Sequence, residues 1–336
     1  MKVRAPGKLI LSGEHAIVYG RPALAMAVNR YAEAQTTAQR APFISFDFGD
    51  LAYQQALRFA TLDRLKERIK QKYRLFLRGE FKIRDVVQKP VELAQFALSL
   101  FFEILNVRPK HGLKIKVQSD IPMGCGMGSS AAIILSIIHA IAQHLELDLS
   151  PELFYRLGLE AENMQHGRSS GLDLKISQRG GCLLVKDGQI LQRPVPKTPL
   201  YLINTGTPAS TTGECVAAAE RFFDDQHLAD EFAVVTDAMD QAIQSNNNMA
   251  FHEAIQQNHR LLVAIGVVPE RVQQFIAELN HSGGAAKICG AGSVAGDNAG
   301  VVMAAIDDVA VLTEHCARYR YSLLPIEAET RGVHVV

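Results

Sequence analysis

The sequence predicts an α+β fold of two domains, and three observations support this. The chain has 336 residues and is 48% hydrophobic, which is enough for more than one core. Strand-like and helical segments are mixed through the first half of the chain. After Pro199 a long helical run precedes a group of strands. We place a soft boundary near residue 190, so that the expected domains are residues 1–190 and 191–336.

The elements of the first half follow from hydrophobic periodicity. Residues 3–11 favour a strand that a turn at Ala5-Pro6-Gly7 interrupts. Residues 62–73 carry mixed charges at helical spacing and predict an exposed helix, whereas residues 91–105 are apolar nearly all round and predict a buried one. Residues 113–117 alternate apolar and basic side chains, as a half-buried strand does.

Turn and cap signals order the rest of the chain. Ser150 and Pro151 are typical of the N-cap and first position of a helix over residues 152–165. Asp187-Gly188 lies between apolar runs and predicts a hairpin. The remaining segments predict strands at 200–204, 286–290, 300–306 and 321–327, and helices over most of 212–280 and at 307–318.

Charge and cysteine usage exclude several classes of protein. Lys+Arg and Asp+Glu each number 35, which argues against nucleic acid as a partner. The five cysteines are odd in number and form no CxxC pair, so we expect a reducing, cytoplasmic compartment. The N-terminus lacks a secretory apolar region, and the longest apolar stretch, residues 131–142, is too short to span a bilayer. We expect no membrane partner.

A glycine-rich loop is the first candidate for a functional site. Gly124, Gly126 and Gly128 stand between a strand and an apolar helix, followed by Ser129 and Ser130. Free N–H groups and the helix dipole make such a helix N-terminus an anion site. The P-loop, dinucleotide-binding and GxSxG patterns are all absent. On these residues alone, a phosphate cradle and a tight helix start capped by Ser129 or Ser130 both stay open.

Other candidates are individually weak. Lys8 lies beside a turn, and Glu14-His15 follow a second turn. Asp173 follows a glycine turn at the start of a strand-like segment, LDLKIS, and Glu162 lies near the end of the preceding helix. Each of these also suits a solvated charge or an ordinary turn acid. A second glycine-rich stretch, residues 285–300, could lie against the phosphate site or form a flexible hairpin.

The order of these segments is more specific than any one of them. APGKLILSGEHAIVYGRPA, IPMGCGMGSSAA and AKICGAG resemble the three motifs of the kinase superfamily named for galactokinase, homoserine kinase, mevalonate kinase and phosphomevalonate kinase, the GHMP kinases. The resemblance runs from residue 3 to the C-terminus, and PGK followed by GEHAIVYG is most similar to the mevalonate kinase branch. It implies an N-terminal α/β domain like ribosomal protein S5 domain 2, a C-terminal ferredoxin-like domain, and an active site in the cleft between them.

The resemblance also implies an activity and residue roles. The reaction would transfer the γ-phosphoryl group of ATP to the 5-hydroxyl of mevalonate. Asp173 would orient or deprotonate that hydroxyl, and Lys8 would keep Asp173 ionised and stabilise the transferred group. Ser130 and Glu162 would hold Mg²⁺. The phosphate-binding set would be Pro122, Gly124, Gly126, Gly128, Ser129, Ser130, Gly290 and Gly292, and the substrate-binding set Glu14, His15, Arg168 and Thr211.

Two departures and several alternatives accompany this hypothesis. Ser169 stands where the family commonly has proline, and Ser293–Asn298 replace a glycine run. Alternative functions are a related kinase for phosphomevalonate, the 3-hydroxyl of mevalonate or a sugar, and a non-catalytic ligand sensor on the same fold. The presence of Lys8, Ser130, Glu162 and Asp173 argues against a sensor. A homodimer is possible, and the role of helix 62–73 stays open.

Overall fold

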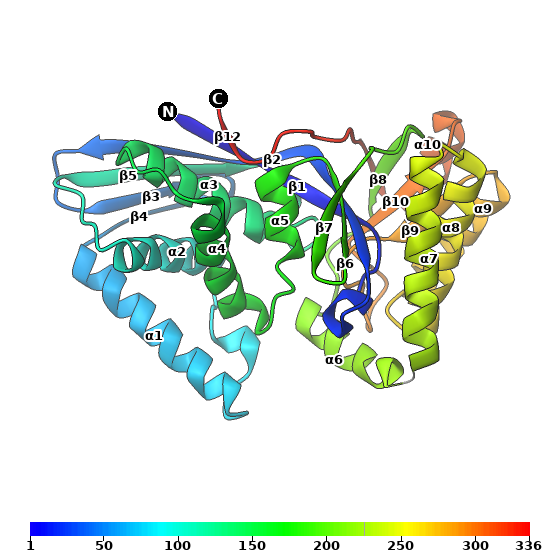
Figure 1. The fold of residues 1–336 in the computed structure, drawn as a ribbon, viewed down its shortest axis with the longest axis horizontal. Helices are drawn as coiled ribbons and strands as arrows, with labels where there is room; N and C mark the ends of the chain where they lie inside the picture. Colours follow the sequence, from blue (N-terminus) through cyan, green and yellow to red (C-terminus); the bar gives the residue numbers. More distant parts are fainter. Residues whose placement is uncertain (225) are drawn as a thin grey trace.

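Two β-sheets, each covered by helices, organise the molecule. The computed structural model describes residues 1–224 and 226–336. One sheet and the helices α1 to α5 form the first half, drawn in blue to green except for the red strand β12, and the second sheet with α6 to α10 forms the other half (Figure 1). The predicted α+β class and two-domain architecture are therefore confirmed.

The first sheet is mixed and contains eight strands. Its order is β12-β1-β2-β5-β3-β4, and β6 pairs with β2 and with β7. All pairs are antiparallel except β3 with β5. The strands are β1 (Lys2–Ser12), β2 (Ala23–Gln39), β3 (Ile44–Phe48), β4 (Tyr53–Leu57), β5 (Gly112–Ser119), β6 (Cys182–Lys186), β7 (Gln189–Arg193) and β12 (His334–Val335). The short 3-10 helices η1 (Ala16–Tyr19), η2 (Gly49–Leu51) and η3 (Ile83–Asp85) lie in its connections.

The expected turn at Ala5-Pro6-Gly7 is wrong. β1 runs without a break through these residues, and its pairing with β2 shifts register between Pro6 and Gly7. Proline has no N–H for the ladder, and a bulge accommodates it without ending the strand. The hairpin at Asp187-Gly188 is confirmed, because both residues have positive φ and join β6 to β7.

The helices of the first half cover one face of this sheet (Figure 1). They are α1 (Phe59–Leu77), α2 (Pro90–Ile104), α3 (Ser129–His144), α4 (Pro151–His166) and α5 (Leu172–Arg179). The predicted exposed helix is α1 and the predicted buried one is α2. The cap of α4 is confirmed, since the Ser150 side chain accepts the Leu153 N–H at 3.2 Å.

The strand expected at Asp173 is wrong. Residues 172–177 belong to α5, which starts after Gly171 in the left-handed conformation and ends at Gly180. Six alternating residues are too short a run to separate a strand from a buried helix, and here Leu172, Leu174, Ile176 and Ser177 are all buried. Asp173 therefore lies in the first turn of a helix.

The second sheet has four antiparallel strands in the order β11-β8-β10-β9. Helices α7, α8 and α9 stand side by side on its outer face (Figure 1). The strands are β8 (Leu200–Asn204), β9 (Ala285–Ile288), β10 (Val301–Ala305) and β11 (Ser322–Pro325), and the helices are α6 (Thr212–Phe223), α7 (Gln226–Gln244), α8 (Asn248–Ala264), α9 (Glu270–His281) and α10 (Val309–Tyr319). These match the predicted elements, and residue 225 within the predicted helical region lies outside the described residues.

The chain crosses between the two sheets after β7. The expected boundary near 190 falls inside β7, which pairs with β6 of the first sheet, and β12 returns to pair with β1. Within the described part of the chain, no helix has the length and apolar character needed to cross a membrane.

Candidate active site

The glycine-rich loop forms an open cradle at the start of α3. Gly124, Gly126 and Gly128 have φ of 70°, 81° and 70°, which side-chain-bearing residues rarely adopt. The N-cap of α3 is Gly128 and not a serine, so the expectation of a Ser129 or Ser130 cap is wrong. The Ser129 hydroxyl is buried and has no hydrogen-bond partner. That leaves a donor and the free N–H groups of α3 for a ligand.

The two glycine-rich stretches lie against each other. A Cβ placed on Gly126 would lie 2.5 Å from the carbonyl oxygen of Cys289, and one on Gly290 would lie 2.7 Å from the Cα of Gly126. A Cβ on Gly292 would lie 2.1 Å from the Val267 carbonyl oxygen. The stretch 285–300 is thus packed at the phosphate loop and joins the second domain to the first.

Lys8 and Asp173 form an ion pair beside this cradle. Lys8 Nζ lies 3.1 Å from Asp173 Oδ1, and the side chain of Asp173 is 28% exposed whereas Lys8 is buried. A Cβ on Gly128 would lie 3.4 Å from Asp173 Oδ2. A partly open carboxylate, a buried ammonium and a helix N-terminus therefore converge on one point, as a phosphoryl-transfer site requires.

Glu162 and Ser130 lie together below the cradle. Ser130 Oγ is 3.4 Å from Glu162 Oε1, and Ser169 Oγ donates to Glu162 Oε2 at 2.8 Å. Burial, and then the nearby charge of Asp173, raise the pKa of Glu162 to about 7. Ser169, the departure from the family pattern, also accepts the Gly171 N–H at 3.0 Å and so orders the loop before α5.

The residues around Glu162 fit a magnesium ion. A carboxylate and a hydroxyl are hard oxygen ligands, and Mg²⁺ is commonly bound by one or two protein groups plus substrate phosphates. A buried carboxylate whose pKa is raised gains most from a cation placed beside it. Among the described residues, no group of three or more His, Cys, Asp and Glu side chains forms a closed metal cage.

Glu14 and His15 lie at the junction of the two domains. Glu14 pairs with Lys287 of β9, and both side chains are almost fully buried. The His15 Nε2 atom lies 3.1 Å from the carbonyl oxygen of Ala291, and burial lowers the pKa of His15 to about 4. His15 is therefore neutral near pH 7 and packs against the third motif.

Arg168 and Thr211 are exposed. The Thr211 hydroxyl accepts the Glu214 N–H at 3.3 Å and caps α6. The loop that carries Arg168 is held by α1, because the Tyr73 hydroxyl donates to the Gly167 carbonyl at 2.6 Å. This contact gives helix 62–73 a structural role in supporting the segment between Glu162 and Asp173.

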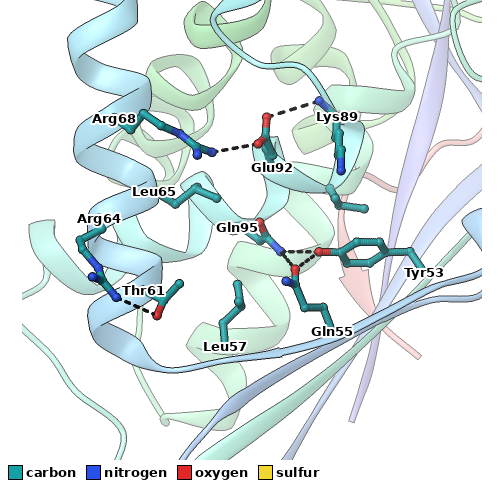
Figure 2. A pocket seen from close by; sticks show the side chains of 11 residues that line it. Tyr53, Gln55, Leu57, Thr61, Arg64, Leu65, Arg68, Lys89, Glu92 and Gln95 are labelled. Carbon is teal, nitrogen blue, oxygen red and sulfur yellow. Dashed lines mark hydrogen bonds and ion pairs between the residues drawn. The ribbon is translucent and has the colours of Figure 1, made fainter.

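Two pockets lie in the first domain. One, of about 100 Å³, is lined by Met123 of the glycine loop, Ile133 of α3 and mostly apolar residues of the sheet. The other, of about 380 Å³, lies between β4, α1 and α2, where Arg64 and Arg68 face Gln95 and Tyr53 (Figure 2). None of the predicted site residues lines the second pocket, whereas the first adjoins the cradle.

Comparisons with known proteins agree with this geometry. The GHMP kinases N terminal domain model matches residues 92–181. The chain is 30% identical over 294 residues to a mevalonate kinase of Archaeoglobus fulgidus, covering 87% of this chain and 89% of that protein. The chain belongs to the mevalonate kinase family of GHMP kinases. It is also 28% identical to a mevalonate kinase of Pyrococcus abyssi, over 86% of this chain and 84% of that protein.

The fold agrees with the mevalonate kinase family as well. A crystal structure of mevalonate kinase superposes with a TM-score of 0.80 at 21% identity and covers 98% of this chain and 100% of that one. The sequence predictions missed three residues that support this site: Lys287, Tyr73 and His166, whose pKa burial lowers. Lys287 stood within the third motif, but its burial depends on a strand far away in the chain.

Proposed function

We propose how these residues carry out the reaction of the family, which is transfer of the γ-phosphoryl group of ATP to the 5-hydroxyl of mevalonate. The observation that carries the assignment of roles is the pairing of Lys8 with Asp173 at 3.1 Å beside the glycine loop and the start of α3. In this pair Asp173 is the acceptor for the proton of the hydroxyl, and Lys8 is the cation for the phosphoryl group that is transferred.

Asp173 accepts a hydrogen bond from the attacking hydroxyl and aims its oxygen at the phosphorus. A carboxylate is a weak base toward an alcohol, but the loose transition state of phosphoryl transfer needs little proton abstraction early. The buried Lys8 ammonium holds Asp173 in place and offsets charge on the equatorial oxygens. Because Lys8 is already in position, no reorganisation is required at the moment of reaction.

The phosphates of ATP lie in the cradle of Gly124, Gly126 and Gly128, with the unpartnered Ser129 hydroxyl as a further donor. Pro122, Gly290 and Gly292 shape its walls. We place the base of ATP in the pocket of about 100 Å³, because Met123 and Ile133 connect it directly to the cradle. Ser130 and Glu162 would hold Mg²⁺, which supplies charge neutralisation for the phosphates.

Mevalonate then approaches Asp173 from the side of η1 and the loop before α5. We propose His15, Arg168 and Thr211 as the surroundings of its carboxylate and methyl end. Glu14, the fourth residue of the predicted substrate-binding set, is almost fully buried and paired with Lys287, so we do not place it against the substrate. The exposed guanidinium of Arg168 suits a carboxylate, and the neutral His15 suits a hydroxyl. A cytoplasmic location is consistent with five cysteines that are all buried and unpaired. The homodimer stays a proposal that light scattering can test.

A coupled ADP-release assay with mevalonate, phosphomevalonate and galactose tests the function. Turnover with mevalonate and a 5-phosphate product identified by ³¹P NMR are expected. No turnover with mevalonate refutes the function. The same assay tests the role of Asp173, because Asp173→Asn is expected to abolish turnover while ATP still binds.

A further inference from the structure

A fully buried lysine joins the second domain to the strand that carries the active-site cation. Lys287 Nζ donates to the Ile288 carbonyl at 2.9 Å, to the Ile10 carbonyl at 3.2 Å and to Glu14 Oε1. An ammonium has three protons, so these three acceptors occupy it completely. Lys287 therefore has no donor left for a substrate and can act on the reaction only through its partners.

Two of the three acceptors of Lys287, Ile10 and Glu14, bear on Lys8. Ile10 lies two positions after Lys8 in β1, so the bond from Lys287 fixes the backbone of the strand that carries Lys8. Glu14 has a second oxygen, Oε2, that is buried without a partner. The positive charge of Lys8 reaches Glu14, since it is among the groups that act on the Glu14 carboxyl. Glu14 is thus a carboxylate within electrostatic range of two lysines.

We infer that Lys287 is a positioning residue for phosphoryl transfer: it anchors Glu14 so that Lys8 stays paired with Asp173. The inference rests on the proposed roles of Lys8 and Asp173. Without the Lys287 ammonium, Glu14 and the Ile10 carbonyl each lose a buried hydrogen-bond donor, and Lys8 is the other lysine that acts on the Glu14 carboxyl. Glu14 then competes with Asp173 and the phosphates for Lys8.

The other titratable groups around Glu14 decide whether anything besides Lys8 could replace Lys287 as its positive partner. The titratable or charged groups acting on or near the pair are Lys8 from β1, Lys287 from β9, Cys289 after β9, His259 from α8 and the adjacent His15. Burial lowers the pKa of His15 and His259 to about 4, so neither supplies a positive charge near neutral pH. Burial raises the pKa of Cys289 to about 11, so it stays a neutral thiol.

Lys287→Met tests the inference, because methionine retains the length of the side chain without its charge. We expect kcat at pH 8 to fall about 10²-fold, while KM for ATP and mevalonate changes less than about threefold. A kcat within about threefold of the parent, or a rise in KM that accounts for the whole loss of kcat/KM, would overturn the inference.

The double variant Lys287→Met/Glu14→Gln separates positioning from support of the fold. It removes both buried charges, so kcat should recover at least about tenfold over Lys287→Met. A double variant as slow as the single one would overturn the inference. If Lys287→Met does not fold, the double variant decides alone: kcat within about tenfold of the parent supports the inference and a loss above about 10³-fold overturns it.

A matched control is available where β1 contacts the helices of the second domain. Thr236→Val removes the buried hydrogen bond of 2.8 Å between Ser12 of β1 and Thr236 of α7 but no charge. It should lower stability while kcat stays within about threefold of the parent. All rates are ratios to the parent with the same substrate. If the parent protein phosphorylates another alcohol and not mevalonate, only the assignment of mevalonate as substrate is refuted. The ratios that test Lys287 are then measured with that alcohol.

Discussion

The buried carboxyl of Glu162 lowers the free energy of unfolding at alkaline pH, and a single substitution should remove this loss. Its carboxyl is buried beside Asp173, and its pKa of about 7 lies above the ordinary 4.5. The folded protein keeps this proton up to about pH 7, whereas the unfolded chain releases it near pH 4.5. Stability therefore falls as the pH rises through this window, because the folded state binds more protons there.

The size of the effect follows from the two pKa values. A rise from 4.5 to about 7 corresponds to about 3 kcal/mol of lost stability at pH 8, at about 1.4 kcal/mol per pH unit. Glu162→Gln keeps the shape of the side chain and an acceptor for Ser169 but carries no charge. We expect this variant to be more stable than the parent by about 3 kcal/mol at pH 8, and by under about 1 kcal/mol at pH 5.

Urea unfolding of both proteins without Mg²⁺ or nucleotide measures this difference. Comparing variant and parent at the same pH cancels the contributions of His15 and His259, which titrate in the opposite sense. Glu152→Gln, an exposed position at the start of the same helix, should change stability by less than about 0.5 kcal/mol. A Glu162→Gln protein no more stable than the parent at pH 8 would refute the reasoning. Its kinase activity should be lost if Glu162 holds Mg²⁺ as proposed.

Three further predictions concern the loop, the cation and acid stability. Gly126→Ala should raise KM for ATP at least about tenfold, because its Cβ would lie 2.5 Å from the Cys289 carbonyl oxygen. Gly124 has open space at the same position, so Gly124→Ala should cost only about 1 kcal/mol of stability. Equal effects of the two substitutions would contradict the contact between the loops. Lys8→Met should lower single-turnover rates about 10²- to 10³-fold with little change in the Kd for ATP, and a near-normal rate would exclude its proposed role. Buried His15 does not take up the proton that the unfolded chain binds near pH 6.5, so its contribution to stability should fall by about 3 kcal/mol between pH 6.5 and 4. His15→Gln should flatten this part of the urea-unfolding profile, and an unchanged profile would contradict the assignment.

Local patterns predicted most of the fold because they act over short distances. The apolar run of α2, the Ser150-Pro151 cap and the Asp187-Gly188 turn each fix their own segment. The two errors have the same origin. Pro6 and the alternation at residues 172–177 suggested a turn and a strand, and only pairing with β2 and packing on three sides decide otherwise.

The site was predictable as a set of motifs but not as a set of contacts. The resemblance to the GHMP kinases implied that Lys8, Glu162 and Asp173 share one site, and it gave no contacts between them. Nothing in AKICG indicates that Lys287 is fully buried, because alternation gives the face of a strand and not what covers it. Ser169 was noted as a departure, but its bond to Glu162 depends on how the loop folds back.

The Glu14–Lys287 contact has a consequence for the order in which the chain folds. The two residues are 273 positions apart, whereas β1 and β2 are neighbours in sequence and can pair early. Loop closure over such a span comes late in folding. During synthesis all strands of the first sheet except β12 emerge before β9 exists, so Glu14 remains hydrated until the second domain docks. Substitutions at Lys287 should then speed unfolding more than they slow folding, and the catalytic centre should be the last part of the molecule to form.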